Sequence, residues 1–220
     1  NERVEENHPD EEILNKSEQQ FQLNLISELF DFQLFLYPIT RLIDIFYKNR
    51  TSIKGTVIDH LQTIKDDGVV ALMKVSNGFK NQLLQFSENT ILPENSSTIQ
   101  ERFTKAVHYF LNNTKNNIQK PLDAIEFSTD NKAVKKDFSK QFDALQEKLE
   151  EKLFALEKMT KGFKVQEYLQ IRAKAVLQKT APIKKKKVAS KRDPILALKL
   201  RELRDGIAKS LGIAHFQIFT

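Results

Sequence analysis

Apolar residues recur three or four positions apart along most of the first 180 residues, and this α-helical period constrains the fold more than any other feature of the chain. Phe21, Leu25, Leu29 and Phe32 show the pattern in the first such segment. No segment alternates apolar and polar residues as a half-buried strand does, and no repeat of fixed length is visible. The sequence therefore predicts an all-α fold whose body is a multi-helix bundle.

Local signals predict where the helices begin and where they are interrupted. The S-x-x-Q and T-x-x-E spacings at Ser17 and Thr98 are capping boxes, so we expect helices to start there. Pro38 is expected to break or kink the first helical run near Leu36. A turn or a helix start is expected at 66–68 ("DDG"), a loop at 88–97 and a polar break at 112–121.

The longest predicted helix is expected to begin near Asp130, and it carries apolar residues seven positions apart. One seam holds Phe142, Leu149, Leu156 and Phe163; the other holds Phe138, Leu145 and Met159, with Lys152 where an apolar residue is expected. Such heptads fit either one helix of the chain's own bundle or a coiled-coil contact with another chain. A last amphipathic helix is predicted at 165–179.

The net charge of +6 is concentrated near the C-terminus. Residues 181–220 contain ten Lys or Arg and three Asp or Glu, whereas residues 1–180 contain 25 basic and 26 acidic residues. Composition thus divides the chain into a flexible acidic N-terminus (1–16), an all-helical body (17–179), a basic linker (180–192) and a C-terminal segment (193–220). The linker fits either a contact with a polyanion or a solvated hinge.

The usual signatures of enzyme chemistry are absent from the sequence. No glycine-rich phosphate-binding loop is present, the four histidines lie far apart, and there is no cysteine. We therefore expect no catalytic residue, no metal site and no cofactor in this chain. There is no run of eighteen apolar residues, so we also expect no membrane contact and a cytoplasmic location.

The segment "LRELRDGIAKSLGIAHFQIFT", 200–220, resembles the first helix and following loop of the HRDC domain, the helicase-and-RNase-D C-terminal domain. The matching features are Leu200-Arg201, Leu203-Arg204, Ile207-Ala208, Gly212-Ile213, Phe216 and Ile218-Phe219. The chain has Ala214 where that family often has proline, and it stops before the family's second helix. Asp193 and Pro194 fit the N-terminus of this helix.

The resemblance implies the C-terminal region of a bacterial ATP-dependent DNA helicase. Its motor domains, which would use ATP and Mg²⁺, are expected before Asn1, and the rest of the HRDC domain after Thr220. The expected partners are DNA, single-stranded or duplex, and the motor domains of the same polypeptide; a homodimer is a further candidate. The alternative is a helical protein-interaction or dimerisation scaffold without a nucleic-acid role.

The expected DNA contacts are basic side chains of the C-terminal region, because each can neutralise a phosphate and release counterions without reading the base sequence. They are Lys184, Lys185, Lys186, Lys187, Lys191, Arg192, Arg201 and Arg204. No aromatic residue interrupts the lysine block, so base stacking is not expected there.

Overall fold

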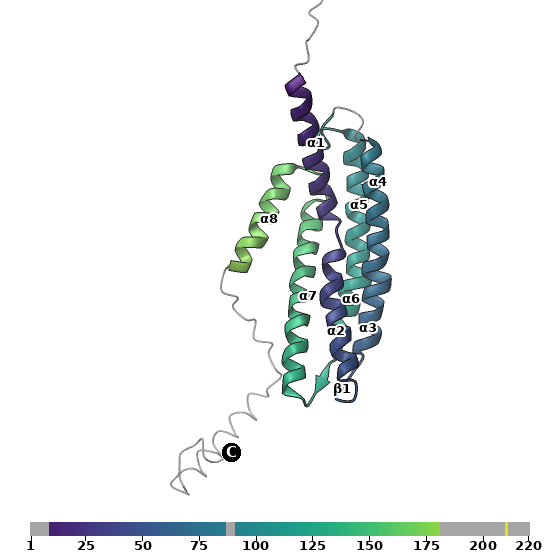
Figure 1. Ribbon diagram of the computed structural model, residues 1–220, viewed down its shortest axis with the longest axis vertical. Coiled ribbons are helices and arrows are strands. Elements are labelled where there is room, and N and C mark those ends of the chain that lie inside the picture. Colours follow the sequence, from purple (N-terminus) through teal and green to yellow (C-terminus); the bar gives the residue numbers. More distant parts are fainter. Residues whose placement is uncertain (1–8, 87–90, 181–209, 211–220) are drawn as a thin grey trace, which may run out of the picture. The chain divides into compact units, whose positions relative to one another are not determined.

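The computed structural model describes residues 9–86, 91–180 and 210 of the chain (Figure 1). The chain divides into two units, Asn1–Gln178 and Lys179–Thr220. The first unit is built from helices, and its only described strands are two residues long. This architecture confirms the predicted all-α, multi-helix body.

The helices of the first unit follow one another as antiparallel columns. In the first column, α1 (Pro9–Leu29), the 3-10 helix η1 (Gln33–Phe35) and α2 (Leu36–Lys48) succeed each other. The second holds α3 (Val57–Thr63), the π-helical segment η2 (Ile64–Val70) and α4 (Ala71–Phe86). The third holds α5 (Ser97–Thr114), the π-helical segment η3 (Lys115–Gln119) and α6 (Lys120–Asp123). The long helix α7 (Lys132–Lys158) is the fourth, and α8 (Val165–Thr180) follows it.

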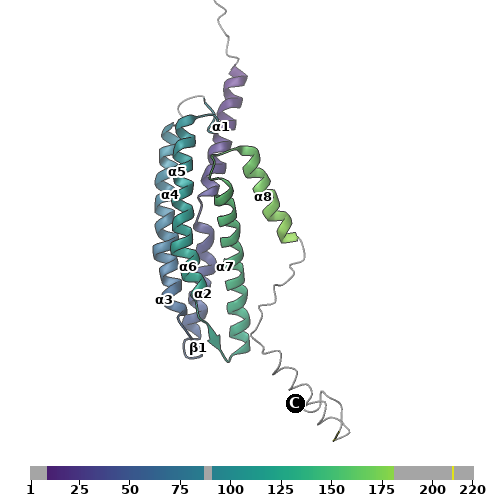
Figure 2. The same ribbon diagram turned by 180° about the vertical axis from the view of Figure 1, so that it is seen from behind.

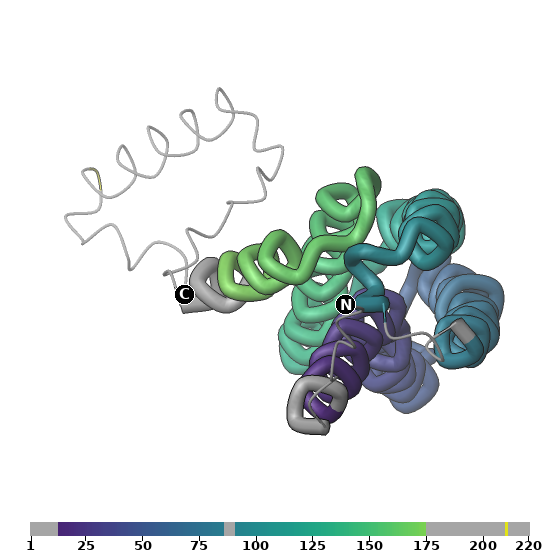
Figure 3. Tube along the Cα trace, turned by 90° about the horizontal axis from the view of Figure 1, so that it is seen from above, coloured from purple at the N-terminus to yellow at the C-terminus, as the bar shows by residue number. Residues whose placement is uncertain are grey.

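Each column packs against two neighbours. Helix α2 contacts α3 and α7, while α5 contacts α4 and α7. The views from front, back and above show these columns enclosing a common interior, with α8 outside them (Figures 1, 2 and 3). At one end, β1 (Ile53–Lys54) pairs antiparallel with β2 (Ser128–Thr129). This pairing links the α2–α3 connection to the α6–α7 connection.

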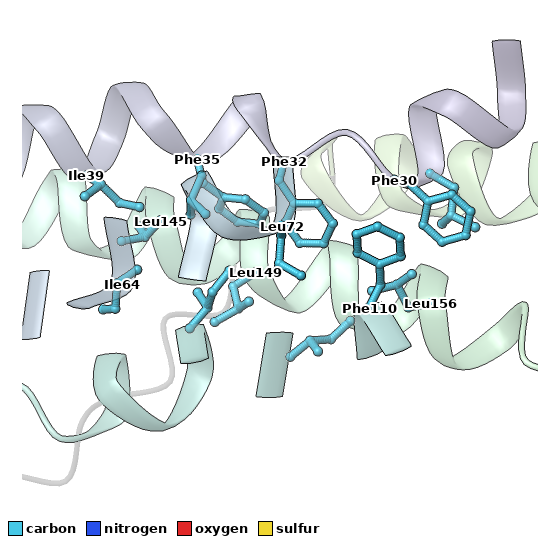
Figure 4. Close-up of a cluster of buried hydrophobic side chains, with 14 of the residues drawn as sticks. Phe30, Phe32, Phe35, Ile39, Ile64, Leu72, Phe110, Leu145, Leu149 and Leu156 are labelled. Carbon is cyan, nitrogen blue, oxygen red and sulfur yellow. The ribbon is translucent and has the colours of Figure 1, made fainter. Parts of the chain in front are cut away.

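Phenylalanine rings fill the centre of this interior (Figure 4). The ring of Phe110 on α5 lies 4.7 Å from that of Phe30 and 5.5 Å from that of Phe32, measured between centroids. All three side chains are fully enclosed. Stacked aromatic pairs of this kind add to the stabilisation that apolar burial provides, so they hold the segment between α1 and α2 against α5.

The heptad seams of α7 face the core of the same chain. Leu145, Leu149, Leu156 and Met159 are buried, and Phe142 is partly buried. Of the two interpretations of the heptads, the structure confirms a helix of the chain's own bundle, because the seams are covered by α2, α5 and α1. Helix α7 ends at Lys158, so Phe163 lies in the turn after the helix, and its side chain is still buried in the core.

Two helix boundaries differ from those predicted, and a third agrees. Helix α1 begins at Pro9, inside the segment 1–16, and therefore Ser17 is not its N-cap. Helix α5 is capped by Ser96, whose hydroxyl accepts a hydrogen bond from the Ile99 amide, so the capping box at Thr98 is wrong by two residues. The predicted break near Leu36 is confirmed, because the 3-10 helix η1 ends at Phe35 and α2 begins at Leu36; Pro38 occupies the first turn of α2, where its missing N–H costs nothing.

Two predicted interruptions are also wrong. The "DDG" turn at 66–68 lies within η2, and the polar break at 112–121 is helical through the end of α5, η3 and α6. A π-helix keeps the backbone hydrogen-bonded while it accommodates an extra residue, so the polar sequence does not end the helix. The predicted helices near Asp130 and at 165–179 are confirmed as α7 and α8.

Candidate nucleic-acid interface

The predicted DNA contacts lie outside the described residues. These are Lys184, Lys185, Lys186, Lys187, Lys191, Arg192, Arg201 and Arg204. The segment that resembles the HRDC domain likewise lies outside the described part of the chain, apart from Ser210. These assignments stay predictions from the sequence.

Within the described residues, a set of basic side chains gathers where α7 passes into α8. We call residues 157–174 the α7–α8 junction. It contains Lys158, Lys161, Lys164, Arg172 and Lys174, against two carboxylates, Glu157 and Glu167. Sequence analysis did not single out these residues, although Lys158, Lys161 and Lys164 follow one another at intervals of three and so indicate a basic face.

Ion pairs neutralise both carboxylates of the junction. Glu157 accepts from Lys115 of α5 at 2.7 Å, and the Glu167 carboxylate lies 3.8 Å from the Lys164 ammonium. Arg172 pairs with Glu28 of α1 at 3.2 Å. No carboxylate among the described residues forms an ion pair with Lys158, Lys161 or Lys174. The junction therefore presents three lysines that an external anion can neutralise.

One glutamine side chain holds the turn of the junction in place. The amide of Gln100 on α5 donates to the Phe163 carbonyl at 2.9 Å and accepts from the Phe163 amide at 2.8 Å. The preceding residue, Gly162, has φ +125°, and a Cβ there would lie 2.8 Å from the Gln100 side-chain oxygen. Only glycine adopts this conformation at low cost, so Gly162 and Gln100 together fix the direction in which α8 leaves α7.

Helix α8 is anchored to α1 and to the loop before α5. Tyr168 and Ile171 are buried, and burial raises the pKa of the Tyr168 hydroxyl well above its ordinary range, with the Glu28 carboxylate adding to the effect. The amide of Val165 donates to the Glu94 carboxylate at 3.4 Å, and Glu94 is in turn bound by Gln22 of α1. The lysines of the junction therefore lie on a fixed scaffold.

Lys152 is a basic residue that does not belong to this surface. Its ammonium donates to the carbonyls of Leu29, at 2.8 Å, and Glu28, at 3.3 Å, and lies 5.4 Å from the centre of the Phe32 ring. Only 8% of the residue is exposed. Burial lowers its pKa to about 8, although the nearby carboxylates of Asp31 and Glu28 oppose the shift. Lys152 thus satisfies carbonyls at the C-terminus of α1, which explains a charge in an apolar seam.

Two other kinds of feature, a metal-ligand cluster and a membrane-spanning helix, are absent from the described residues. In the part of the chain that the structure describes, no three or more His, Asp or Glu side chains come together as metal ligands would. Among the same residues, no helix has the length and apolarity that crossing a bilayer requires.

Comparison with known families defines the class of this fold. The family model "DNA helicase, middle domain" matches residues 13–180, which form the helical bundle. This range covers most of the chain and contains all of α2 to α8. The chain belongs to the DNA helicase middle-domain family. No curated protein and no solved structure gives a significant match to it.

Proposed function

We propose that this chain is a non-catalytic accessory region of a DNA helicase, which contributes electrostatic nucleic-acid binding and serves as a scaffold for the motor domains. The observation that carries the proposal is the middle-domain match over the helical body, 13–180. The charge distribution supports it, because the excess of basic residues lies in 181–220, next to the body in sequence. Basic segments of this kind bind phosphates without regard to base sequence.

The finer parts of the proposal come from the resemblance of the C-terminal segment. An HRDC-like helix at 193–220 would place a second nucleic-acid-binding element after the linker. The motor domains of the same polypeptide would bind ATP and Mg²⁺, and the parent protein would be a bacterial, cytoplasmic hydrolase. DNA is the partner that all these assignments share.

The alternative, a dimerisation scaffold without a nucleic-acid role, loses its main support. That interpretation depended on a heptad face free to contact another chain, and the seam residues of α7 are buried within their own bundle. A homodimer would therefore need a different surface. We keep DNA binding as the function to be tested.

The test is fluorescence anisotropy of a labelled oligothymidine strand and of a duplex, titrated with the full chain over a salt series. The variant replaces Lys184, Lys185, Lys186 and Lys187 by Gln. Because each lysine that meets a phosphate of a single strand contributes about −0.7 to the slope of log K against log salt, we expect the slope to become less negative by roughly 3.

A matched control replaces four exposed lysines of α7, Lys132, Lys135, Lys136 and Lys140, by Gln. The net charge changes equally in both variants, so only the location of the lysines differs. We expect the control to lower affinity less and to leave most of the salt slope in place. An equal loss in both variants would remove the assignment of DNA binding to the linker, and no binding by the unmodified chain at low salt would refute the function itself.

A further inference from the structure

A cleft of about 190 Å³ opens between the end of α7 and the middle of α8. Its walls are formed by Phe154 and Lys158 on one side and by Glu167, Gln170, Ile171 and Lys174 on the other, with the buried Met159 between them. Pockets for drug-sized ligands measure roughly 300–1,000 Å³. A cleft of this size therefore suits a single planar ring rather than a whole nucleotide cofactor.

Phe154 is the unusual member of this lining. It lies on α7 but belongs to neither heptad seam, and 39% of the residue is exposed, whereas Phe138 of the same helix is buried. The ammonium of Lys158, one turn further on, lies 5.6 Å from the centre of the Phe154 ring. Phe154 thus lines the cleft, and the cation over its ring can also meet a phosphate.

The polar groups of the cleft complement a nucleobase and its backbone. Gln170 offers an amide that can both donate and accept at the edge of a base. The Glu167 carboxylate lies 3.8 Å from the Lys164 ammonium, so its repulsion of an incoming phosphate is partly offset. Lys158 and Lys174 border the cleft, and Lys161 lies on the turn that joins its two helices.

We propose that this cleft is a subsite for single-stranded DNA, in which one base stacks on Phe154 while Lys158, Lys161 and Lys174 bind the flanking phosphates. The proposal rests on the proposed function, and it adds an aromatic contact that the basic linker lacks. Stacking on an aromatic side chain combined with a basic track is the usual way to bind a single strand without sequence preference. A duplex cannot use the cleft, because its bases are already stacked inside the helix.

The charges around Phe154 also favour one path for the strand. Glu150 and Glu151 lie one turn before Phe154 on α7, whereas the unpaired lysines lie at and beyond Lys158. Phosphates would therefore follow the α7–α8 junction rather than the body of α7. The strand would run across the end of the bundle where Gln100 holds the junction turn.

The experiment compares two labelled strands of equal length, oligothymidine and a strand of abasic sites, by anisotropy with the full chain. Stacking contributes about 1–3 kcal/mol for each base, so Phe154→Ala should weaken oligothymidine binding roughly 5- to 150-fold. The same change should alter abasic-strand binding less than about two-fold, because only the backbone is left. Phe154→Trp should retain oligothymidine affinity.

Phe21→Ala is the matched control, since Phe21 is an exposed phenylalanine on α1, outside the cleft. Ultraviolet cross-linking of a strand that contains 5-bromouracil, followed by peptide mapping, gives a second readout on the unmodified chain, independent of variant folding. Cross-links are expected within the peptides that carry Phe154 and Gln170.

Three results would overturn the subsite. If Phe154→Ala binds oligothymidine as the unmodified chain does, while the linker variant at 184–187 binds it weakly, the cleft is excluded and the proposed function stands. Cross-links that map only outside α7 and α8 lead to the same conclusion. If the unmodified chain binds neither strand, the subsite and the proposed function fall together.

Discussion

Lys152 occupies a position of the α7 seam where an apolar side chain is expected, and its burial should make stability depend on pH. Its pKa is about 8 in the folded chain, against 10.5 ordinarily. Between these values the unfolded chain binds more protons than the folded chain, so the free energy of unfolding should rise as pH rises from 8 towards 10.5. Well below pH 8 the ammonium is charged in both the folded and the unfolded chain, so Lys152 adds no pH dependence to the free energy of unfolding there.

Lys152→Met isolates this effect, because methionine has similar length and no proton to lose. We expect the free energy of unfolding of the unmodified chain, minus that of Lys152→Met, to increase by roughly 1–3 kcal/mol between pH 7.5 and pH 10. Urea unfolding followed by circular dichroism at several pH values measures it. Tyr168 titrates in both proteins, so its contribution cancels. Parallel pH curves for the two proteins would contradict a buried, charged Lys152.

At the scale of the element, the two π-helical segments depend on one close approach between them. Segments η2 and η3 are in contact, and Gly68 of η2 lies against the backbone of η3. A Cβ at Gly68 would lie 2.8 Å from the Asn117 carbonyl oxygen and 2.9 Å from Cγ1 of Ile118. The glycine is thus required by packing, although its backbone conformation is ordinary.

Gly68→Ala should therefore destabilise the bundle by roughly 1–3 kcal/mol, since the η2 and η3 backbones would have to separate. Gly78 on α4 is the control, because nothing lies within 4 Å of a Cβ built there. Gly78→Ala should stabilise by about 0.5–1 kcal/mol, as alanine restricts the unfolded chain and favours helix. Urea midpoints that move in the same direction for both variants would rule out the packing role of Gly68.

These elements also show which parts of the fold the sequence can predict. Apolar residues such as Leu25 and Leu29 in α1, and Leu149 in α7, recur at helical spacing because one face of each helix is buried. The helices and the all-α class were therefore predictable. The π-helical segments were not, because the polar residues 112–117 and the "DDG" at 66–68 are breaker signals that tertiary contact overrides. Gly68 does not end the helix. It allows the Asn117 backbone to pack closely against η2, and this contact cannot be read from the local sequence.

The candidate site was predictable to a smaller extent. The basic linker can be identified from composition, because a charge run needs no partner to be visible. The cleft depends on the angle at which α8 leaves α7, and that angle is fixed by Gly162 and by Gln100, which is distant in sequence. One local signal was present, since Phe154 is an aromatic residue on the polar side of a heptad helix.

At the scale of the whole molecule, the charge and the core are separated along the chain. The helical body is nearly neutral, and its apolar seams are covered by its own helices. The basic excess lies in 181–220. Because these seams are covered within one chain, we expect the stability of the body to be independent of association, and that independence can be measured.

Leu149 is fully within the core, so the stability it provides should not depend on protein concentration. Leu149→Ala should lower the free energy of unfolding by about 2–5 kcal/mol, because it leaves a cavity where α7 packs on its neighbours. Glu150→Ala, the exposed neighbour, should change it by less than about 0.5 kcal/mol.

Thermal melts over a hundred-fold range of protein concentration should give the same Tm for each protein, since no partner chain completes the seam. Two results together would instead mean that the α7 seam is shared between two copies. The Tm of the unmodified chain would rise with concentration, and the stability lost in Leu149→Ala would grow as the protein is diluted.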